Sequence, residues 1–465
     1  MQTLAAKSVR CIVEAGLLVA VALAVLAFGG TSPQFFAISQ VIILSLGTLY
    51  LLAGRSVSTI PVPLPVTVPF LLLALVVLQI APLPISLAPI VGVSATSRLP
   101  HSSFTISAAP YQTTSQLLAF VTQLTAFYLV LAICVDQRAK KRLVLALLAI
   151  GAFEAFYGLV QYLTGWQQIF FYVKKFYLED ATGTYINRNH FAGLLEMILP
   201  FAVVFALQHV WRLRQKTPAE TATARKLLSS VELPFLLFWV FIAAVLFAAL
   251  VSSHSRMGIL SALASLIAVL ALTGTSRLPA RARAAVGALF LLGMVGVAVW
   301  VGSDPAITRF ETLNDQYTHP GQDRLSIWRD TLHLIGRHPI LGSGFGSFAV
   351  VYPSAQTAFL NNVVDHAHCD YLEIVAELGL PGGVLLFGAV FCVLGRTFGH
   401  CKKRGDGYDK TISFACVGSI VAILLHGLAD FNLYIPANAL VFAMILALAW
   451  SNANRAANPE GMPGG

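Results

Sequence analysis

The sequence predicts an all-α polytopic membrane protein with about twelve transmembrane helices. Of its 465 residues 57% are hydrophobic and 11% charged, whereas about a quarter of the residues of a soluble domain are charged. The mean hydropathy is +0.77. Long apolar runs bounded by charges recur along the whole chain, and about twenty such residues cross a bilayer as a helix. A soluble core of this size has no room for so much apolar surface.

The apolar runs place the predicted spans and divide the chain into four parts. The spans are 11–28, 35–53, 66–83, 116–134, 143–163, 191–210, 232–251, 257–274, 286–301, 380–395, 411–427 and 437–450. The parts are 1–301 with spans one to nine, an outward loop domain at 302–379 with amphipathic helices, 380–452 with spans ten to twelve, and a disordered tail at 453–465.

The distribution of Lys and Arg predicts that both termini are cytoplasmic. Most of the 30 basic residues fall on one side, in segments such as "DQRAKKR", "WRLRQK" and "RTFGHCKKRGDGYDK". Basic residues favour the inner side of a membrane. The net charge of +9 is therefore explained by topology, and it does not indicate a nucleic-acid partner.

Two outward arginines stand at the predicted starts of spans. Arg256 lies in "VSSHSRMGIL", and Arg188 lies in "GTYINRNHFAGLL" beside Asn189 and His190. Free backbone N–H groups at a helix start bind anions, so the two arginines favour an anionic ligand. An anchor at the membrane interface and a partner for a carboxylate are the alternatives.

A second pair of arginines, Arg324 and Arg329, lies in "GQDRLSIWRDTLHLIGRHPI". Helical spacing predicts an amphipathic helix near the interface, or a structural lid with solvated charges. Its apolar face would consist of Leu325, Ile327, Trp328, Leu332 and Leu334. The following "GSGFGS" lacks the Lys-Ser/Thr of a phosphate loop, and we interpret it as a tight turn.

The segment "VVDHAHCDYLEIVAELG" at 363–379 carries the most reactive side chains. If Asp365 caps a helix here, His366 and His368 point about 200° apart and cannot bind one metal. No third ligand follows at zinc spacing, so we predict no metal and no cofactor. His366 would join a solvated or salt-bridged stripe of Asp370, Glu373 and Glu377.

On the same helix His368 would face packed protein or a pocket. An imidazole there is suited to proton transfer, and a packing role is the alternative. Asp430, between the last two predicted spans, would pair with an arginine or cap a loop. Glu154 and Glu196 fall inside spans, where a charge is costly. They should face the protein interior, where an arginine is a possible partner.

Several of these motifs, over residues 180–450, resemble the O-antigen ligase and polymerase superfamily of bacterial envelope glycosyltransferases. They are "GTYINRNHFAGLLEMILPFA", "SSHSRMGIL", "GQDRLSIWRDTLHLIGRHPILGSGFGSF" and "HAHCDYLEIVAELGLPGG". The resemblance implies a GT-C-like transferase of the inner membrane that acts at its periplasmic face. The implied donor is a glycan on undecaprenyl diphosphate, and the implied acceptor is lipid A–core or a second lipid-linked glycan.

The resemblance also implies roles for individual residues. His368 matches the family's catalytic histidine, and Arg256 and Arg324 match its diphosphate-binding arginines, with Arg188 a third candidate. The family usually has Asn after the histidine, where this chain has Cys369. The role of orienting the ring would then pass to another group such as Asp370. This departure leaves the choice of base between His368 and His366 open.

Three functions are favoured, and a protein-glycosylating relative stays open within the transferase class. The first is an inverting, metal-independent ligase that transfers O-antigen to lipid A–core, and the second is a polymerase of lipid-linked repeats. The third is a transporter of lipid-linked sugars, which usually has repeated halves and polar groups along a membrane path. The sequence shows neither of these two features.

Overall fold

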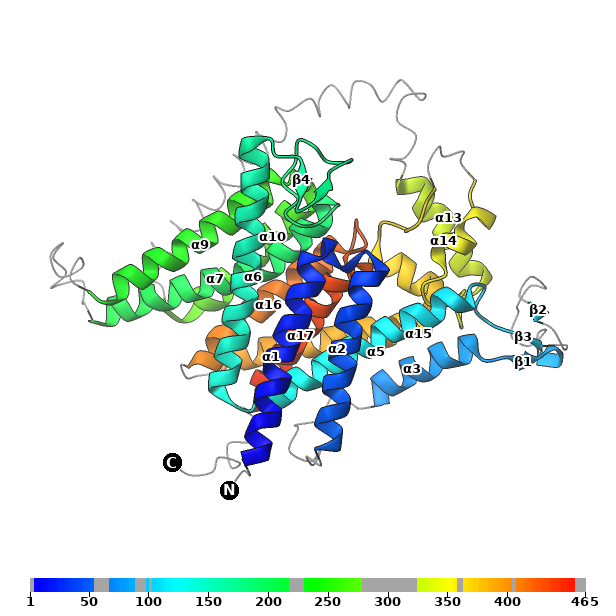
Figure 1. The fold of residues 1–465 in the computed structure, drawn as a ribbon, viewed down its shortest axis with the longest axis horizontal. Helices are drawn as coiled ribbons and strands as arrows, with labels where there is room; N and C mark the ends of the chain where they lie inside the picture. Colours follow the sequence, from blue (N-terminus) through cyan, green and yellow to red (C-terminus); the bar gives the residue numbers. More distant parts are fainter. Residues whose placement is uncertain are drawn as a thin grey trace.

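The computed structural model describes residues 4–53, 67–87, 98–99, 103–216, 230–277, 324–357, 363–403 and 407–455. Within them the fold is almost entirely helical (Figure 1), as predicted. The helices are α1 (Leu4–Leu26), α2 (Pro33–Leu52), α3 (Thr67–Ile80), α5 (Pro110–Ile133), α6 (Gln137–Thr164), α7 (Arg188–Lys216), α9 (Glu232–Ser252), α10 (Arg256–Arg277), α13 (Arg324–Arg337), α14 (Phe348–Val351), α15 (Asp370–Lys402), α16 (Tyr408–His426) and α17 (Pro436–Arg455). Short 3-10 turns are η1 (Phe28–Gly30), η3 (Ile85–Leu87), η7 (Tyr352–Ser354) and η8 (Asn432–Tyr434).

Ten of the described helices are long and apolar enough to cross a membrane, and α3 is a shorter apolar helix. Every predicted span that falls on described residues coincides with one of these helices. The ninth predicted span, 286–301, lies outside the described residues, as do positions 302–323 of the predicted loop domain and 456–465 of the predicted tail.

Local signals in the sequence account for several helix ends. The Asp136 side chain accepts a hydrogen bond from the Arg138 N–H at 2.7 Å and so caps the start of α6. The same helix ends at Gly165, whose φ of +69° is the left-handed conformation that glycine adopts without strain. Pro110 begins α5, where its missing N–H costs no hydrogen bond.

Helices α7 and α17 form the centre of the bundle. Of their membrane-spanning residues 89% and 83% are buried, against 17% for α9, which therefore lies on the outside. Helix α16 packs against α7, and the Ser419 hydroxyl donates a hydrogen bond across this contact to the Met197 carbonyl. The site described below is built on the ends of these central helices.

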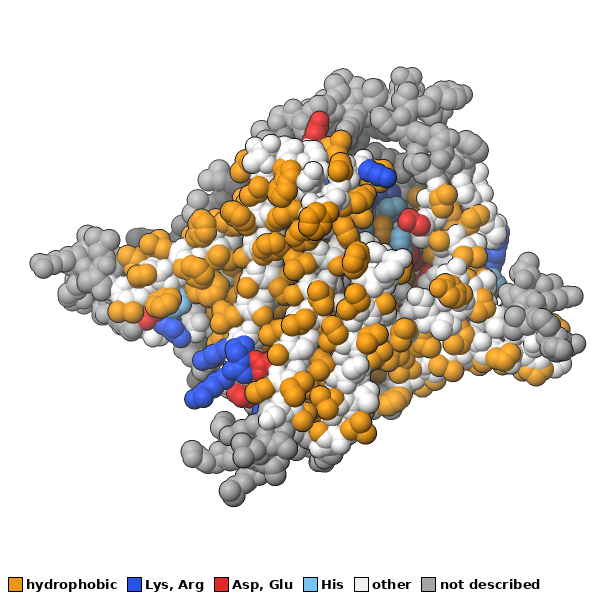
Figure 2. All heavy atoms as spheres, viewed as in Figure 1, with side chains coloured by type: hydrophobic (Ala, Val, Ile, Leu, Met, Phe, Trp, Pro, Cys, Tyr) orange, Lys and Arg blue, Asp and Glu red, His pale blue; other side chains and the backbone are white. Residues whose placement is uncertain are grey.

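One end of the bundle is held by ion pairs. Arg142 of α6 pairs with Glu14 of α1, and buried Lys140 binds both Asp409 and Asn452 at 2.7 and 2.6 Å. In Figure 2 blue and red side chains gather at this lower end, whereas the flank of the bundle is largely hydrophobic. The starts of α6 and α16 and the end of α17 therefore meet on one side.

The opposite end carries short strands that the all-α prediction did not include. Strands β1 (Leu83–Pro84), β3 (Ser103–Phe104) and β2 (Arg98–Leu99) form an antiparallel sheet in that order. Strands β4 (Gln168–Ile169) and β5 (Tyr172–Val173) form a hairpin just beyond α6, near the top of Figure 1.

Helix α13 is amphipathic, but its buried face differs from the predicted one. Ile327 and Leu334 are buried, whereas Leu325 and Leu332 are exposed. The buried side includes Asp330, which accepts hydrogen bonds from the Tyr352 hydroxyl and from Thr357. A buried carboxylate with such partners turns the helix away from the orientation that apolar spacing alone favours.

Helix α15 joins the predicted acidic helix to the predicted tenth span. Its 33 residues measure about 50 Å, more than the roughly 30 Å of a bilayer core. The two parts meet at Gly379, where φ is +72°. A Cβ there would lie 2.2 Å from the Ile340 carbonyl oxygen, so the break permits close packing of the loop after α13.

Candidate active site

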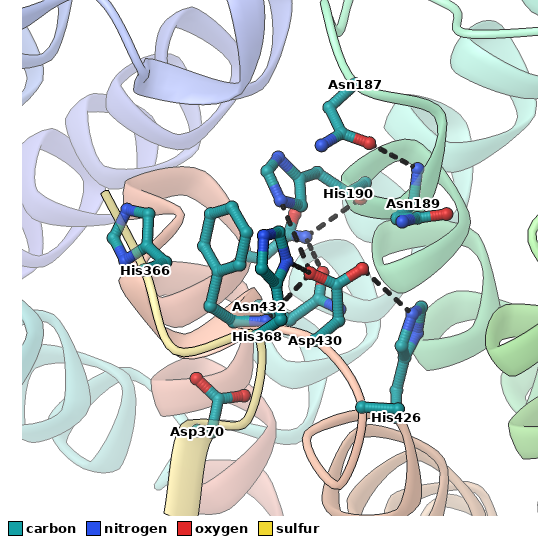
Figure 3. Close-up of polar contacts among 12 residues, drawn as sticks. Asn187, Asn189, His190, His366, His368, Asp370, His426, Asp430 and Asn432 are labelled. Carbon is teal, nitrogen blue, oxygen red and sulfur yellow. Dashed lines mark hydrogen bonds and ion pairs between the residues drawn. The ribbon is translucent and has the colours of Figure 1, made fainter. Parts of the chain in front are cut away.

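The two histidines of the 363–379 segment precede α15 and do not belong to it. The helix begins at Asp370, its N-cap is Cys369, and His368 has a φ of +49°. The prediction that the two rings lie on opposite faces of a helix is therefore wrong. The predicted capping role of Asp365 is wrong as well. In Figure 3 His366 and His368 lie on either side of one phenylalanine ring.

Glu373 fixes this histidine segment. One of its oxygens lies 2.6 Å from His366 Nδ1, and the other accepts the Ala367 N–H at 2.7 Å. Glu373 is buried, so the predicted stripe is salt-bridged and not solvated. Burial opposes a charge on His366, but attraction to Glu373 and the hydrogen bond with it outweigh burial and raise the pKa of His366.

Phe431 provides the ring around which the histidines gather. His366 stacks on it with centroids 3.9 Å apart and an angle of 12°. His368 and His190 meet its edge at 5.1 and 4.7 Å. Aromatic pairs favour such stacked and edge-on geometries. Phe431 therefore holds rings from α7 and from the segment before α15 in one cluster.

Asp430, the neighbour of Phe431, is the centre of charge in the cluster (Figure 3). It is 1% exposed. Its Oδ1 lies 3.9 Å from His190 Nε2 and 3.9 Å from His368 Nδ1, and its Oδ2 lies 3.8 Å from His426 Nε2. Burial alone would raise the pKa of Asp430, but the three imidazoles hold it well below its usual range. The three imidazole nitrogens that face Asp430 are buried and lack a hydrogen-bond partner among the described residues.

Asp370, the first residue of α15, contacts the loop between α16 and α17. Its backbone N–H donates to the carbonyls of Gly427 and Asp430 at 2.9 and 3.0 Å, and its carboxylate accepts the Leu433 N–H at 3.2 Å. Asp370 therefore fastens the α16–α17 loop to the start of α15. The carboxylate beside the His368 ring is Asp430, and the orienting role suggested for Asp370 stays a prediction.

Arg324 reaches the cluster from the first residue of α13. Its Nη1 donates to the Ala429 carbonyl, next to Asp430. One turn later Trp328 Nε1 donates to the Ala367 carbonyl at 3.1 Å, between the two histidines. Helix α13 thus covers the histidine segment, and in Figure 2 pale blue histidine side chains are visible in a recess on this side.

Arg188, the first residue of α7, lies on another side of the cluster. It pairs with Asp180 at 2.9 Å, and its guanidinium lies 5.4 Å from the Tyr177 ring centre. Burial raises the pKa of Tyr177; Arg188 and Arg324 lower it, while Asp430 and Asp180 raise it. Tyr177 therefore lies within electrostatic range of both arginines and of Asp430.

Arg256 begins α10 as predicted, with the Gly258 N–H donating to the Ser255 hydroxyl at 3.3 Å. A Cβ on Gly258 would lie 2.6 Å from that of Ala192, so this helix start abuts the first turn of α7. The Arg256 side chain is exposed, and no hydrogen bond or ion pair among the described residues joins it to the cluster. Arg329 is likewise exposed.

Residues 239–387 match a family model described as O-antigen ligase. Over these residues the chain is similar to the O-antigen ligase family. The match includes Arg256, Arg324, His366 and His368, begins after Arg188 and ends before Asp430. None of the curated proteins matches the chain. The family confirms the resemblance drawn from the motifs, and it supports a membrane enzyme of the O-antigen ligase or polymerase type.

The matched region, residues 239–387, contains a glycine-rich turn whose role the sequence did not reveal. The N–H groups of Gly346 and Phe348 donate to the two oxygens of Glu377 at 2.7 and 2.9 Å, and the Tyr434 hydroxyl donates to it at 2.6 Å. Gly344 and Gly346 have positive φ, which suits such a tight turn. "GSGFGS" thus binds the protein's own carboxylate.

An apolar cavity of about 150 Å³ lies beside the cluster, between α3, α5, α15 and α17. Gln116, Gln123 and Tyr434 supply its polar lining, and the remaining lining residues are apolar. The Tyr434 ring lies 5.4 Å from that of His366. The cavity therefore begins next to the histidine segment and continues along membrane-spanning helices.

The structure groups most of the predicted site residues. Those that lie close together are His368, His366, His190, Asp430, Arg188 and Arg324. Asn189 lies beside them, and its backbone N–H donates a hydrogen bond to the Asn187 side chain. Sequence reasoning missed the parts played by His426, Phe431 and Glu377. No spacing rule identifies them, because their partners are distant in sequence.

Proposed function

We propose that this chain transfers a glycan from undecaprenyl diphosphate to an acceptor hydroxyl at the periplasmic face of a bacterial inner membrane. The acceptor we favour is lipid A–core, and the reaction inverts the anomeric carbon. The observation that carries the proposal is one accessible imidazole held beside a buried carboxylate, with two arginines close by. A general base and a site for an anionic leaving group are the two parts that the reaction requires.

His368 acts as the base. Three imidazoles lie 3.8–3.9 Å from Asp430, but the His368 side chain is 30% exposed, against 6% for His190 and 0% for His426. Its Nδ1 faces Asp430, so its Nε2 accepts the proton of the acceptor hydroxyl. The hydroxyl oxygen then attacks the anomeric carbon from the side opposite the diphosphate. Asp430 stabilises the imidazolium that forms.

His366 is the weaker candidate for the base. Its Nδ1 is 2.6 Å from Glu373, and this contact raises its pKa. A histidine that keeps its proton cannot accept another. We therefore assign His366 to holding the segment on Phe431.

Arg324 and Arg188 neutralise the diphosphate, and Arg256 joins them from the adjacent helix start. Arg324 uses one Nη1 on the Ala429 carbonyl, and Arg188 Nε has no partner among the described residues. The remaining guanidinium N–H groups suit charge-assisted bonds to phosphate oxygens. Because the diphosphate leaves once its charge is neutralised, no metal or cofactor is needed.

The apolar cavity supports a lipid carrier as donor. Its walls are apolar and it begins beside the histidine segment, which suits the first part of a prenyl chain while the diphosphate lies at the cluster. Helix α16 runs from Asp409 at the ion-paired end, beside Lys140 of the predicted cytoplasmic segment "DQRAKKR", to His426 at the site. This arrangement supports cytoplasmic termini and a periplasmic site.

Glycan transfer by the purified protein tests the proposal. The donor is a glycan on undecaprenyl diphosphate and the acceptor is lipid A–core, with a second lipid-linked glycan as the alternative that a polymerase would use. His368→Ala should lower kcat by about two to four powers of ten, whereas His333→Ala, at an exposed position on α13, should not. Full activity of His368→Ala would discard the assignment of the base.

A further inference from the structure

A second carboxylate–imidazole pair lies behind Asp430, inside the bundle. Glu196 belongs to α7 and His426 is the last residue of α16, and both are 0% exposed. His426 Nδ1 lies 3.0 and 3.1 Å from the two oxygens of Glu196. Its other ring nitrogen, Nε2, lies 3.8 Å from Asp430 Oδ2. The predicted arginine partner for Glu196 is thus replaced by a histidine.

The four groups form a continuous chain. It runs from Glu196 to His426, from His426 to Asp430, and from Asp430 to His368, which is the only one of the four with substantial exposure. Ionisable groups are costly inside a membrane protein. The buried Glu196–His426 pair lies directly behind Asp430, the carboxylate of the site.

Resting on the proposed function, we infer that His426, held by Glu196, is a positioning residue that fixes the orientation and charge of Asp430 opposite His368. A hydrogen bond to Glu196 orients the ring, because it leaves only Nε2 to face Asp430. A positive charge there attracts the inner oxygen of Asp430, so its outer oxygen remains directed at His368. The pair does not touch the substrate.

The groups that face His426 set its charge. Glu196 from α7 and Asp430 from the α16–α17 loop are the carboxylates that face His426, and Arg324 from α13 and His190 from α7 are the basic groups nearby. Asp430 in turn faces His190, His368 and His426. Removing His426 takes one of three imidazoles from around Asp430, so Asp430 should take up a proton at a higher pH.

Steady-state transfer by His426→Gln and Glu196→Gln tests this inference. We expect kcat to fall about 10- to 100-fold, the loss typical of a small misplacement of a catalytic group, while the donor KM changes by less than about twofold. The acid limb of the kcat–pH profile should move to higher pH in His426→Gln. Ser419→Ala is the matched control, because it removes an α16–α7 hydrogen bond next to Glu196 without touching the chain of four groups.

A double-mutant comparison excludes a merely structural role. In Asp430→Asn, adding His426→Gln should cause little further loss, since both changes act through the same group. Additive losses, or an unchanged acid limb in His426→Gln, would overturn the inference. If His426→Gln does not fold, Glu196→Gln gives the same readouts. Full activity of His368→Ala would instead refute the proposed base, so the two failures are distinguishable.

Discussion

Replacing Asp430 by Asn is the most direct test of the electrostatics of the site. The change keeps the side-chain volume but removes the charge that lies 3.9 Å from His368 Nδ1. When His368 takes the proton of the acceptor, an imidazolium forms at that distance. Two unit charges 3.9 Å apart interact by about 1 kcal/mol in water and about 4 kcal/mol at an effective dielectric constant of about 20. Asp430 is buried, so we expect a value nearer the upper figure.

An energy of about 1 to 4 kcal/mol corresponds to a loss of roughly 5- to 1,000-fold in kcat. The assay is glycan transfer in nanodiscs at saturating acceptor, with donor KM measured in parallel. Because the interaction appears only when the proton moves, kcat should fall while KM stays close to that of the wild type. A folded Asp430→Asn protein with the wild-type kcat would refute the reasoning.

Three further predictions follow from single contacts. Arg324→Lys keeps the charge but not the planar fork, so the donor KM should rise about 10- to 100-fold in the same assay, and an unchanged KM would remove this residue from the diphosphate site. Gly193→Ala places a Cβ 2.1 Å from Asn432 Oδ1 and should cost about 1–3 kcal/mol, seen as a lower Tm; an unaltered Tm would show that the contact relaxes. The pKa of His366 is raised from 6.5 in the folded state. Its pair with Glu373 therefore stabilises the protein fully below about pH 6.5, and this stabilisation is lost as the pH rises through the folded-state pKa. The Tm of the wild type should therefore fall more than that of His366→Gln between pH 6 and pH 9, and parallel falls would contradict the pairing.

The spans were predictable because each depends on local composition. A run such as 232–251 is apolar enough that no tertiary contact is needed to identify it, and α9 (Glu232–Ser252) follows it closely. The starts of α7 and α10 were also correct, because Arg188 and Arg256 follow short polar residues that cap helices.

The histidine segment shows where local reasoning failed. Helical spacing extended the helix back to Asp365, but the chain turns at Cys369 and the Ala367 N–H binds Glu373. A buried carboxylate that captures a backbone N–H outweighs helix propensity, which amounts to less than about 1 kcal/mol for each ordinary residue. Nothing in the order of the residues indicates that Glu373 is buried.

The long-range contacts could not be predicted in principle from one sequence. Asp430 meets His368 and His190 across 62 and 240 positions, and these pairs exist only because α7, α15 and α16 pack side by side. Sequence reasoning selected His368, Arg188 and Arg324 individually, but it left the carboxylate among them with a minor role.

The buried carboxylates explain how loops without regular structure are held in place. Each one is buried and receives hydrogen bonds or an ion pair from a different outer segment. Glu154 holds Thr184 of the loop before α7, Asp180 holds His254 of the α9–α10 turn, Glu373 holds the histidine segment, Glu377 holds the glycine-rich turn and Asp370 holds the α16–α17 loop. A buried carboxyl group that loses its hydrogen-bond partner costs about 1–3 kcal/mol, and more when it is charged, so each segment is fixed more firmly than backbone contacts alone would fix it. The site is therefore rigid where the bundle anchors it, and the exposed edge of His368 remains the part open to a substrate.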